Sequence, residues 1–411
     1  MSRRLLEGLQ IEQWGSVRSG DPAAAWLVYD EASEVVGPIA EFLRDFAARG
    51  NSVSSVRSYA YVLLRWWRWL ATVDVVWDRA TQAEVRDLTL WLQLHPKPQR
   101  RPRTVSASTA GTTNQLTGKR YLDDQYAART IRHGNAVISS FYEFWGEQGL
   151  GPVVNPVARD YHGHGRANAH HNPMNRYVPE GRIRHNPKLP RRRPRAMTDE
   201  AWGALFDSMR SNRDRALLAL ALSNGARASE ILGIRRTDVD WGNQQVRVVR
   251  KGSRAEQWLP GSNEAFVWLR LYLAEVGGGM RDPLWVTLRN RRRADGAMDR
   301  APLTYDALRA VVRRANAKLG TNWTMHDLRH TCALRMAADE NVSLRDVQTI
   351  LGHAHLETTA EIYLVEDERH TVERVAEHLS RLAEPRPDPK PVAQGYSAGD
   401  LAVIFGDGVL S

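Results

Sequence analysis

Apolar residues recur at helical spacing in the first third of the chain. The pattern predicts a helix that begins near Pro38 and ends before Gly50. Its apolar positions are Ile39, Phe42, Leu43, Phe46 and Ala47. A second helix is predicted directly after it, from the stripe Val56, Tyr59, Leu63, Leu64, Trp67 and Leu70. The residues before position 30 show no clear period.

Two further helices complete this region. Thr81 and Glu84 have the spacing of a capping box, which predicts the start of a third helix. A fourth is predicted from Thr130 to the residues before Gly149. Between them, residues 96–118 are rich in Pro, Arg, Ser and Thr, which is typical of a long exposed loop. The four helices predict a compact first domain over residues 36–150.

The pattern changes after residue 195. Residues 245–250 and 257–259 alternate in polarity around Lys251, which predicts a β-hairpin. Helices are predicted to begin at Thr198 and Thr304 and to cover residues 214–222, 326–338, 343–351 and 367–383. The sequence therefore predicts a mainly α-helical protein with a small antiparallel β-sheet.

Composition narrows the class of protein. The 411 residues include 57 Lys and Arg against 47 Asp and Glu, a net charge of +10, which makes polyanions the natural partners. The one cysteine, Cys332, excludes an internal disulfide framework. The longest purely apolar run, residues 216–222, is too short to span a bilayer. We expect a soluble cytoplasmic protein, associated with the nucleoid, that has no membrane partner.

A strongly basic segment separates the two halves. Residues 151–195 hold ten Arg and Lys residues against Asp160 and Glu180, together with five histidines. A metal site is one interpretation of the histidines His162, His164, His170, His171 and His185. Because no cysteine or ordered carboxylate accompanies them, we favour an interdomain linker that follows nucleic acid.

A basic face is predicted on the second helix. Arg57, Tyr61, Arg65 and Arg68 recur at helical spacing, with Trp66 beside them. Such a face could lie along a phosphate backbone, and a merely solvated surface is an equally good interpretation.

Several familiar catalytic motifs are absent from the sequence. It has no phosphate-binding loop that ends in Lys-Ser/Thr, no dinucleotide fingerprint, no His-Glu-x-x-His pair and no evident carboxylate cluster for magnesium. We therefore expect neither a cofactor nor a metal.

Basic and phenolic residues stand out in the second half. They are Arg227 in Gly-Ala-Arg-Ala-Ser-Glu, Lys251 in the hairpin, His326 and Arg329 in His-Asp-Leu-Arg-His, His353 after Leu-Gly, and Tyr363. His326 and Arg329 are three residues apart, so one helical face would present both. Each residue alone has an ordinary structural explanation; their order together is more specific.

This order resembles the tyrosine recombinases, also called phage integrases, over residues 195–384. Carried over position by position, the resemblance implies the catalytic set Arg227, Lys251, His326, Arg329, His353 and Tyr363, with Glu230 orienting Arg227. It implies a two-domain DNA clamp: an N-terminal extension (1–35), a helical core-binding domain (36–150), the basic linker (151–195), a catalytic domain (196–384) and a C-terminal tail (385–411).

The resemblance also implies the chemistry. The tyrosine attacks a DNA phosphate and forms a 3′-phosphotyrosyl link without metal or ATP. A phenol with a pKa near ~10 is mostly protonated at neutral pH, so its full ionisation would cost about 4 kcal/mol, and neighbouring cations and a base must offset this. The expected partner is double-stranded DNA with inverted half-sites, bound by a homotetramer with a dimer on each site, and accessory proteins are possible partners.

Two other functions fit the same residues. A type IB topoisomerase uses similar chemistry on one duplex, although the Arg-x-Ser-Glu and Leu-Gly-His contexts favour a recombinase. A DNA-binding accessory protein with a vestigial site is the second alternative, and the complete catalytic set argues against it.

Overall fold

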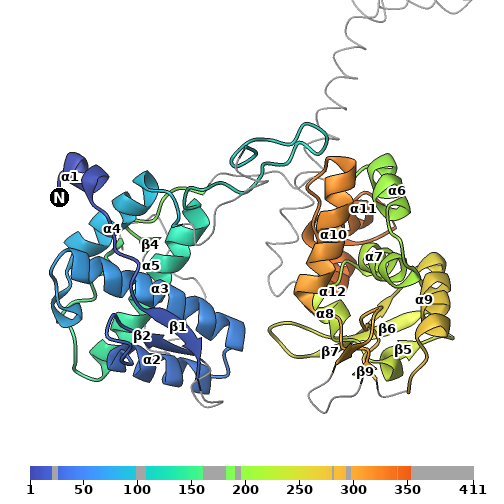
Figure 1. Ribbon diagram of the computed structural model, residues 1–411, viewed down its shortest axis with the longest axis horizontal. Helices are drawn as coiled ribbons and strands as arrows, with labels where there is room; N and C mark the ends of the chain where they lie inside the picture. Colours follow the sequence, from blue (N-terminus) through green and yellow to red (C-terminus); the bar gives the residue numbers. More distant parts are fainter. Residues whose placement is uncertain are drawn as a thin grey trace, which may run out of the picture. The chain divides into compact units, whose positions relative to one another are not determined.

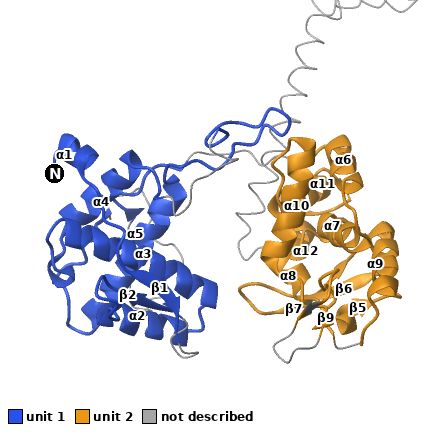
Figure 2. Cartoon of the chain, in the orientation of Figure 1, with its two compact units in different colours: residues 1–192 blue, residues 193–411 orange. Residues whose placement is uncertain are grey.

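The computed structural model describes residues 1–20, 26–98, 108–160, 182–189, 196–279, 282–292, 298–339 and 341–352. The chain divides into two compact units, residues 1–192 and residues 193–411 (Figure 2). The predicted helix at 367–383 and the tail lie outside the described residues. No helix in the described ranges combines the length and the apolar character that crossing a bilayer requires.

Unit 1 is mainly helical (Figure 1). Its helices are α1 (Arg3–Gly8), α2 (Gly37–Ala48), α3 (Val53–Thr72), the short 3-10 helix η1 (Trp77–Arg79), α4 (Gln82–Leu94) and α5 (Ala128–Glu147). The four helices predicted from the sequence are thus present, and α4 begins at the predicted capping box of Thr81 and Glu84. Large aromatic side chains fill the core, where the Trp66 indole donates a hydrogen bond to the Tyr142 hydroxyl at 3.0 Å.

The first residues of the chain belong to the core of unit 1. Strands β1 (Ser16–Ser19) and β2 (Trp26–Tyr29) pair in antiparallel register and pack against α3. Leu6, Ile11 and Val28 are buried in the same apolar cluster as the helices. The described part of residues 1–35, predicted as an N-terminal extension, therefore packs into the core of this unit. Elements of four to six residues are too short to show a clear period.

The described ends of the basic segment 151–195 also pack on unit 1. Strands β3 (Arg159–Asp160) and β4 (Arg182–Ile183) form a short antiparallel pair. Val157 joins the core, and the Asn135 side-chain amide donates to Asn186 Oδ1 at 3.0 Å. The segment is thus partly folded at both described ends. His162, His164, His170 and His171 lie outside the described residues.

Unit 2 is built around helix α7, whose middle turns are apolar and buried. Its helices are α6 (Asp199–Asp207), α7 (Asn212–Asn224), α8 (Ala228–Leu232), the 3-10 helix η2 (Arg236–Asp238), α9 (Asn263–Val276), α10 (Tyr305–Leu319), α11 (Met325–Ala337) and α12 (Leu344–Leu351). Residues 216–221 of α7 are all buried, because α9 and α11 pack against it. Serine or threonine side chains cap the first turns of α6, α7, α9, α10 and α12.

A three-stranded antiparallel sheet completes unit 2. Strands β5 (Val239–Asp240), β6 (Gln245–Val249) and β7 (Glu256–Pro260) lie in the order β5-β6-β7. A separate pair is formed by β8 (Arg291–Arg292) and β9 (Met298–Asp299). The β6–β7 turn has positive φ angles at Gly252 and Arg254. The predicted hairpin around Lys251 and the mainly α fold class are confirmed.

Candidate active site

Arg329 links three helices of unit 2. It lies on α11 and is only 6% exposed. Its guanidinium donates to the carbonyl oxygen of Gly225 at 2.6 Å and to that of Leu351 at 2.7 Å. Gly225 ends α7 and Leu351 is the last residue of α12. These bonds use two of the five N–H groups of the guanidinium.

Arg227 follows the same end of α7 and precedes α8. Its backbone N–H donates to Glu230 Oε2 at 3.0 Å, and its guanidinium donates to Glu230 Oε1 at 2.8 Å. The Arg227 side chain remains one third exposed, whereas Glu230 is buried. Glu230 thus fixes Arg227 as the resemblance implied, and the arginine keeps a solvent-facing side.

Glu230 also collects two donors from the hairpin. The Arg250 guanidinium donates to Glu230 Oε2 at 3.1 Å, and the backbone N–H of Lys251 donates to Glu230 Oε1 at 3.0 Å. Arg250 is a site residue that was not predicted from the sequence. The alternation of the strand indicates its inward position, since Val246, Val248 and Arg250 are the buried positions of this stretch.

The arginine cluster consists of Arg227, Arg250 and Arg329, whose charges influence one another. Burial, and then the positive charge of Arg227, lower the pKa of Arg329 to about 10. Burial also lowers the pKa of Arg250. Burial raises the pKa of Glu230, but the backbone N–H groups of Arg227 and Lys251 and the Arg227 side chain bring the net pKa below its ordinary value. At neutral pH the cluster therefore holds charged arginines around one carboxylate, an arrangement suited to binding an anion.

The remaining predicted residues fall into two groups. Lys251 is exposed on the hairpin turn, and His326 is exposed near the start of α11. The His326 ring stands edge-on to the His330 ring, with their centroids 4.3 Å apart. His353 and Tyr363 lie outside the described residues. Gly352, the residue before His353, has a left-handed conformation at the end of α12, with φ of 63°.

The predicted DNA-binding face of α3 is divided in the structure. Arg57 is exposed, and its guanidinium lies over the rings of Trp26 and Tyr61 at 4.9 and 5.7 Å. Arg68 instead donates to the Trp14 carbonyl at 2.6 Å.

The other basic residue of this face also turns inward. Burial lowers the pKa of Arg65, whose guanidinium lies 5.2 Å from the Tyr126 ring centroid. Trp66, expected beside this face, is fully buried in the core. The predicted basic face is therefore only partly exposed, because residues 13–15 and 126, distant in sequence, contact α3.

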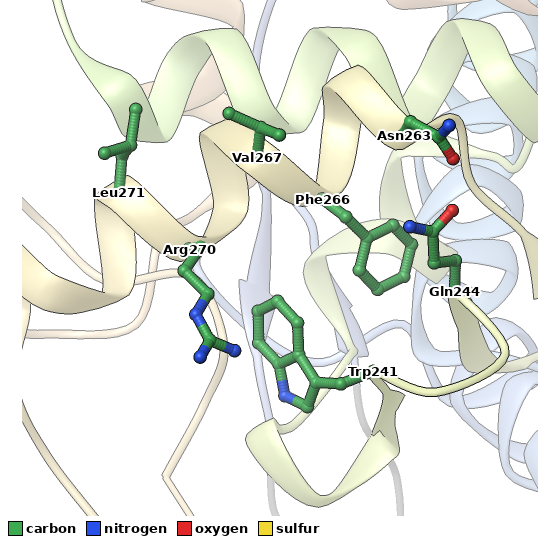
Figure 3. A pocket seen from close by; sticks show the side chains of 7 residues that line it. All are labelled: Trp241, Gln244, Asn263, Phe266, Val267, Arg270 and Leu271. Atoms are coloured by element: carbon green, nitrogen blue, oxygen red, sulfur yellow. The ribbon is translucent and has the colours of Figure 1, made fainter.

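A hollow of about 470 Å³ lies elsewhere on unit 2, beside α9 (Figure 3). The Arg270 guanidinium lies 5.3 Å from the Trp241 ring centroid, and the Trp241 and Phe266 rings meet edge to face. The hollow is lined by Trp241, Gln244, Asn263, Phe266, Val267, Arg270 and Leu271. Of the predicted catalytic residues that the structure describes, none lines this hollow.

Comparison with known proteins identifies the family. The model of the phage integrase family matches residues 196–370, which include all six residues of the predicted catalytic set. Residues 196–370 therefore form a domain of the phage integrase family. The sequence-based prediction of the family is thereby confirmed.

Relatives among the tyrosine recombinases and transposases extend this finding. The chain is 28% identical over 240 residues to the tyrosine recombinase XerC of Staphylococcus carnosus, covering 56% of this chain and 69% of that protein. It is 23% identical over 357 residues to transposase A from transposon Tn554 of Staphylococcus aureus, covering 84% and 91%. The second alignment is long enough to include parts of both units.

Solved structures support the tyrosine recombinase fold. The structure of the XerH site-specific recombinase bound to palindromic difH substrate matches with a TM-score of 0.53 and 15% identity, covering 93% of this chain and 94% of that one. A lambda integrase dimer bound to a COC′ core site matches with a TM-score of 0.51 and 15% identity, covering 79% and 76%.

Proposed function

We propose that this tyrosine recombinase is an active site-specific DNA recombinase that cuts and rejoins DNA through a 3′-phosphotyrosyl intermediate. The observation that supports it most is the arginine cluster. Arg227 precedes α8 and Arg329 lies on α11, yet the charge of Arg227 lowers the pKa of Arg329. Glu230 holds Arg227 with its guanidinium partly exposed. Such an arrangement suits the two non-bridging oxygens of one phosphate.

In the proposed reaction, the Tyr363 hydroxyl oxygen forms a bond to phosphorus while the bond from phosphorus to the 5′ oxygen breaks. His326 takes the tyrosine proton, and Lys251 gives a proton to the departing 5′ oxygen. Arg227 and Arg329 stabilise the charge that builds on the phosphate, and His353 donates a hydrogen bond to it. The products are a tyrosyl phosphodiester and a free 5′-hydroxyl.

The same proposal explains how strands are rejoined. The tyrosyl ester retains the phosphodiester bond, so a 5′-hydroxyl from a partner strand can reverse the first displacement. We propose double-stranded DNA with inverted half-sites as the substrate, in the nucleoid, with a dimer on each site and a tetramer joining two sites. Two comparisons support recombination between DNA sites. The matched XerH structure is a complex with a palindromic substrate, and the transposase alignment spans most of this chain.

A covalent-capture experiment tests the proposal. The full chain is mixed with duplexes that carry a randomised centre and a nick at varied positions, so that the released 5′-hydroxyl fragment diffuses away. Adducts resistant to detergent are isolated, and their DNA is amplified over several rounds. We expect the wild-type chain to enrich one duplex sequence and the Tyr363→Phe variant to yield no adduct. An undiminished adduct with Tyr363→Phe would reject this nucleophile.

The selected duplex also separates the alternatives. A recombinase joins two duplexes into four-way junctions and exchanged products. Relaxation of supercoiled plasmid without junctions would instead indicate a topoisomerase, and binding of duplex without any adduct would indicate an inactive accessory protein.

A further inference from the structure

We infer that Arg250 is a positioning residue that holds the Lys251 hairpin against the last turn of α12. The inference rests on the proposed function, in which Lys251 protonates the departing 5′ oxygen. It assigns a role to a residue that lies between the sheet and the catalytic helices and that the family motif does not include.

Arg250 contacts three separate elements. Its Nε donates to Gln257 Oε1 on β7 at 2.8 Å, and its Nη1 donates to Glu230 Oε2 on α8 at 3.1 Å. Its Nη2 donates to the carbonyl oxygen of Ile350 on α12. The side chain is 5% exposed, and Glu230 is 1% exposed. Because each of its three nitrogens donates a hydrogen bond, this buried guanidinium is held in one geometry and fixes the backbone from which it projects.

The end of α12 receives three side-chain donors in succession. Gln257 Nε2 donates to the carbonyl of Thr349 at 3.0 Å, Arg250 to that of Ile350, and Arg329 to that of Leu351. The last carbonyls of a helix have no partner within the helix, and the negative end of its dipole favours cations. The hairpin and α11 thus both attach to the same helical turn.

The attachment reaches Lys251 through the backbone. Lys251 directly follows Arg250, and its own N–H donates to the same Glu230 that accepts from Arg250 and Arg227. The turn beyond it is exposed and has positive φ angles at Gly252 and Arg254. The exposed lysine therefore starts from a backbone position that Arg250 and Glu230 set relative to Arg227.

Gly352 permits this close approach. A Cβ at this position would lie 2.9 Å from Arg250 Nε, and the residue has φ of +63°. A side chain here would strain the backbone and push Arg250 away from the end of α12. The glycine before His353 thus allows the contact as well as the cap.

The test distinguishes a defect in proton delivery from a structural defect that slows cleavage of either substrate. Cleavage is measured on the duplex selected by covalent capture and on the same duplex with sulfur in place of the bridging 5′ oxygen at the cut phosphate. A departing thiolate needs no proton, so a defect in proton delivery disappears on the sulfur substrate. Lys251→Ala should be slowed about 100-fold on the oxygen substrate and restored on the sulfur substrate.

We expect Arg250→Gln to follow the same pattern, with a loss of about tenfold or more on oxygen and near wild-type cleavage on sulfur. Arg247→Gln is the matched control. Arg247 lies on β6, three residues before Arg250, and pairs with Asp238 and Glu256, so its loss perturbs the sheet without touching α12. This control should cleave both substrates at similar fractions of the wild-type rate.

Two results would overturn the inference. If Lys251→Ala is restored by sulfur but Arg250→Gln stays slow on both substrates, Arg250 does not act through Lys251. If Lys251→Ala is not slowed on oxygen, the proposed role of the lysine itself fails, and the inference fails with it. Should Arg250→Gln not fold by circular dichroism, Gly352→Ala displaces the same guanidinium and must show the same selective loss on oxygen.

Discussion

Arg227 donates to Glu230 from both its backbone N–H and its guanidinium, at 3.0 and 2.8 Å. Because Glu230 is buried and also accepts from Arg250 and Lys251, this carboxylate organises the cations of the candidate site. The contribution of this buried carboxylate to the free energy of unfolding can be measured separately from catalysis.

Glu230→Gln should destabilise the protein strongly. The substitution leaves the buried Arg250 guanidinium without its counter-charge, and breaking a buried pair costs about 3 kcal/mol or more. Glu256→Gln is the comparison, since Glu256 pairs with Arg247 at a mostly exposed position and should lose less than about 1 kcal/mol. Urea unfolding at pH 7 measures both. Equal losses in the two variants would show that the carboxylate is not structurally important.

The stability contributed by Glu230 should depend on pH. Because the fold lowers the pKa of Glu230 below its ordinary value of 4.5, folding favours the ionised form. The contribution is complete above the unfolded pKa and is lost as the pH falls through the lower folded pKa. The difference in unfolding free energy between the wild type and Glu230→Gln should therefore shrink on acidification below about pH 4.5. A difference that grows on acidification would reverse the assigned direction of the shift.

Arg329→Lys should abolish efficient cleavage. An ammonium cannot reproduce the planar fork that reaches both Gly225 and Leu351, and it leaves fewer donors for a phosphate. We expect cleavage of the selected duplex to fall about 100-fold. Arg335→Lys, on the exposed part of the same helix where Arg335 pairs with Asp199, is the control and should cleave normally. Near-normal cleavage by Arg329→Lys would contradict the proposed role.

Arg57 and Arg68 should behave differently although both lie on α3. Arg57→Ala should weaken binding to a random-sequence duplex and reduce the slope of log affinity against log salt by about 1, because Arg57 is exposed. Arg68→Ala should mainly lower stability, by about 1–3 kcal/mol, because it leaves the Trp14 carbonyl without its donor. Fluorescence anisotropy and urea unfolding measure the two effects. A loss of stability in Arg57→Ala together with a changed salt dependence of DNA binding in Arg68→Ala would reverse the assignment.

Cys332 should be inert in the folded protein. Burial raises the pKa of its thiol to about 12, so almost no thiolate exists at pH 8. A colorimetric disulfide reagent should react with it only after unfolding in guanidinium, and then with one equivalent of thiol. Fast reaction of the native protein would show that this part of α11 is accessible.

The sequence predicted what depends on local spacing. The amphipathic stripes of α2 and α3 and the hairpin turn around Lys251 were visible because each repeats over neighbouring residues. The predictions that needed correction involve contacts between distant segments. The basic face of α3 was predicted to be exposed, because the sequence around Arg68 does not show that residues 13–15 bind it.

The candidate site shows the same division. The order of Arg227, Lys251 and Arg329 could be recognised in the sequence. In the structure, Arg227 contacts the Glu230 carboxylate and Arg329 contacts the end of α12. Arg250 was not identified, because an arginine next to a strand is ordinarily exposed. Its inward position follows from the alternation with Val246 and Val248 only once the sheet's buried face is known.

The most direct measurement is to identify the amino acid that carries DNA. The wild-type adduct on the selected duplex is digested with trypsin and nuclease, and the peptide that retains a nucleotide is fragmented by mass spectrometry. We expect a phosphodiester that joins the Tyr363 hydroxyl to a 3′ end of the DNA. A nucleotide attached to any other residue, or linked through a 5′ phosphate, would contradict it.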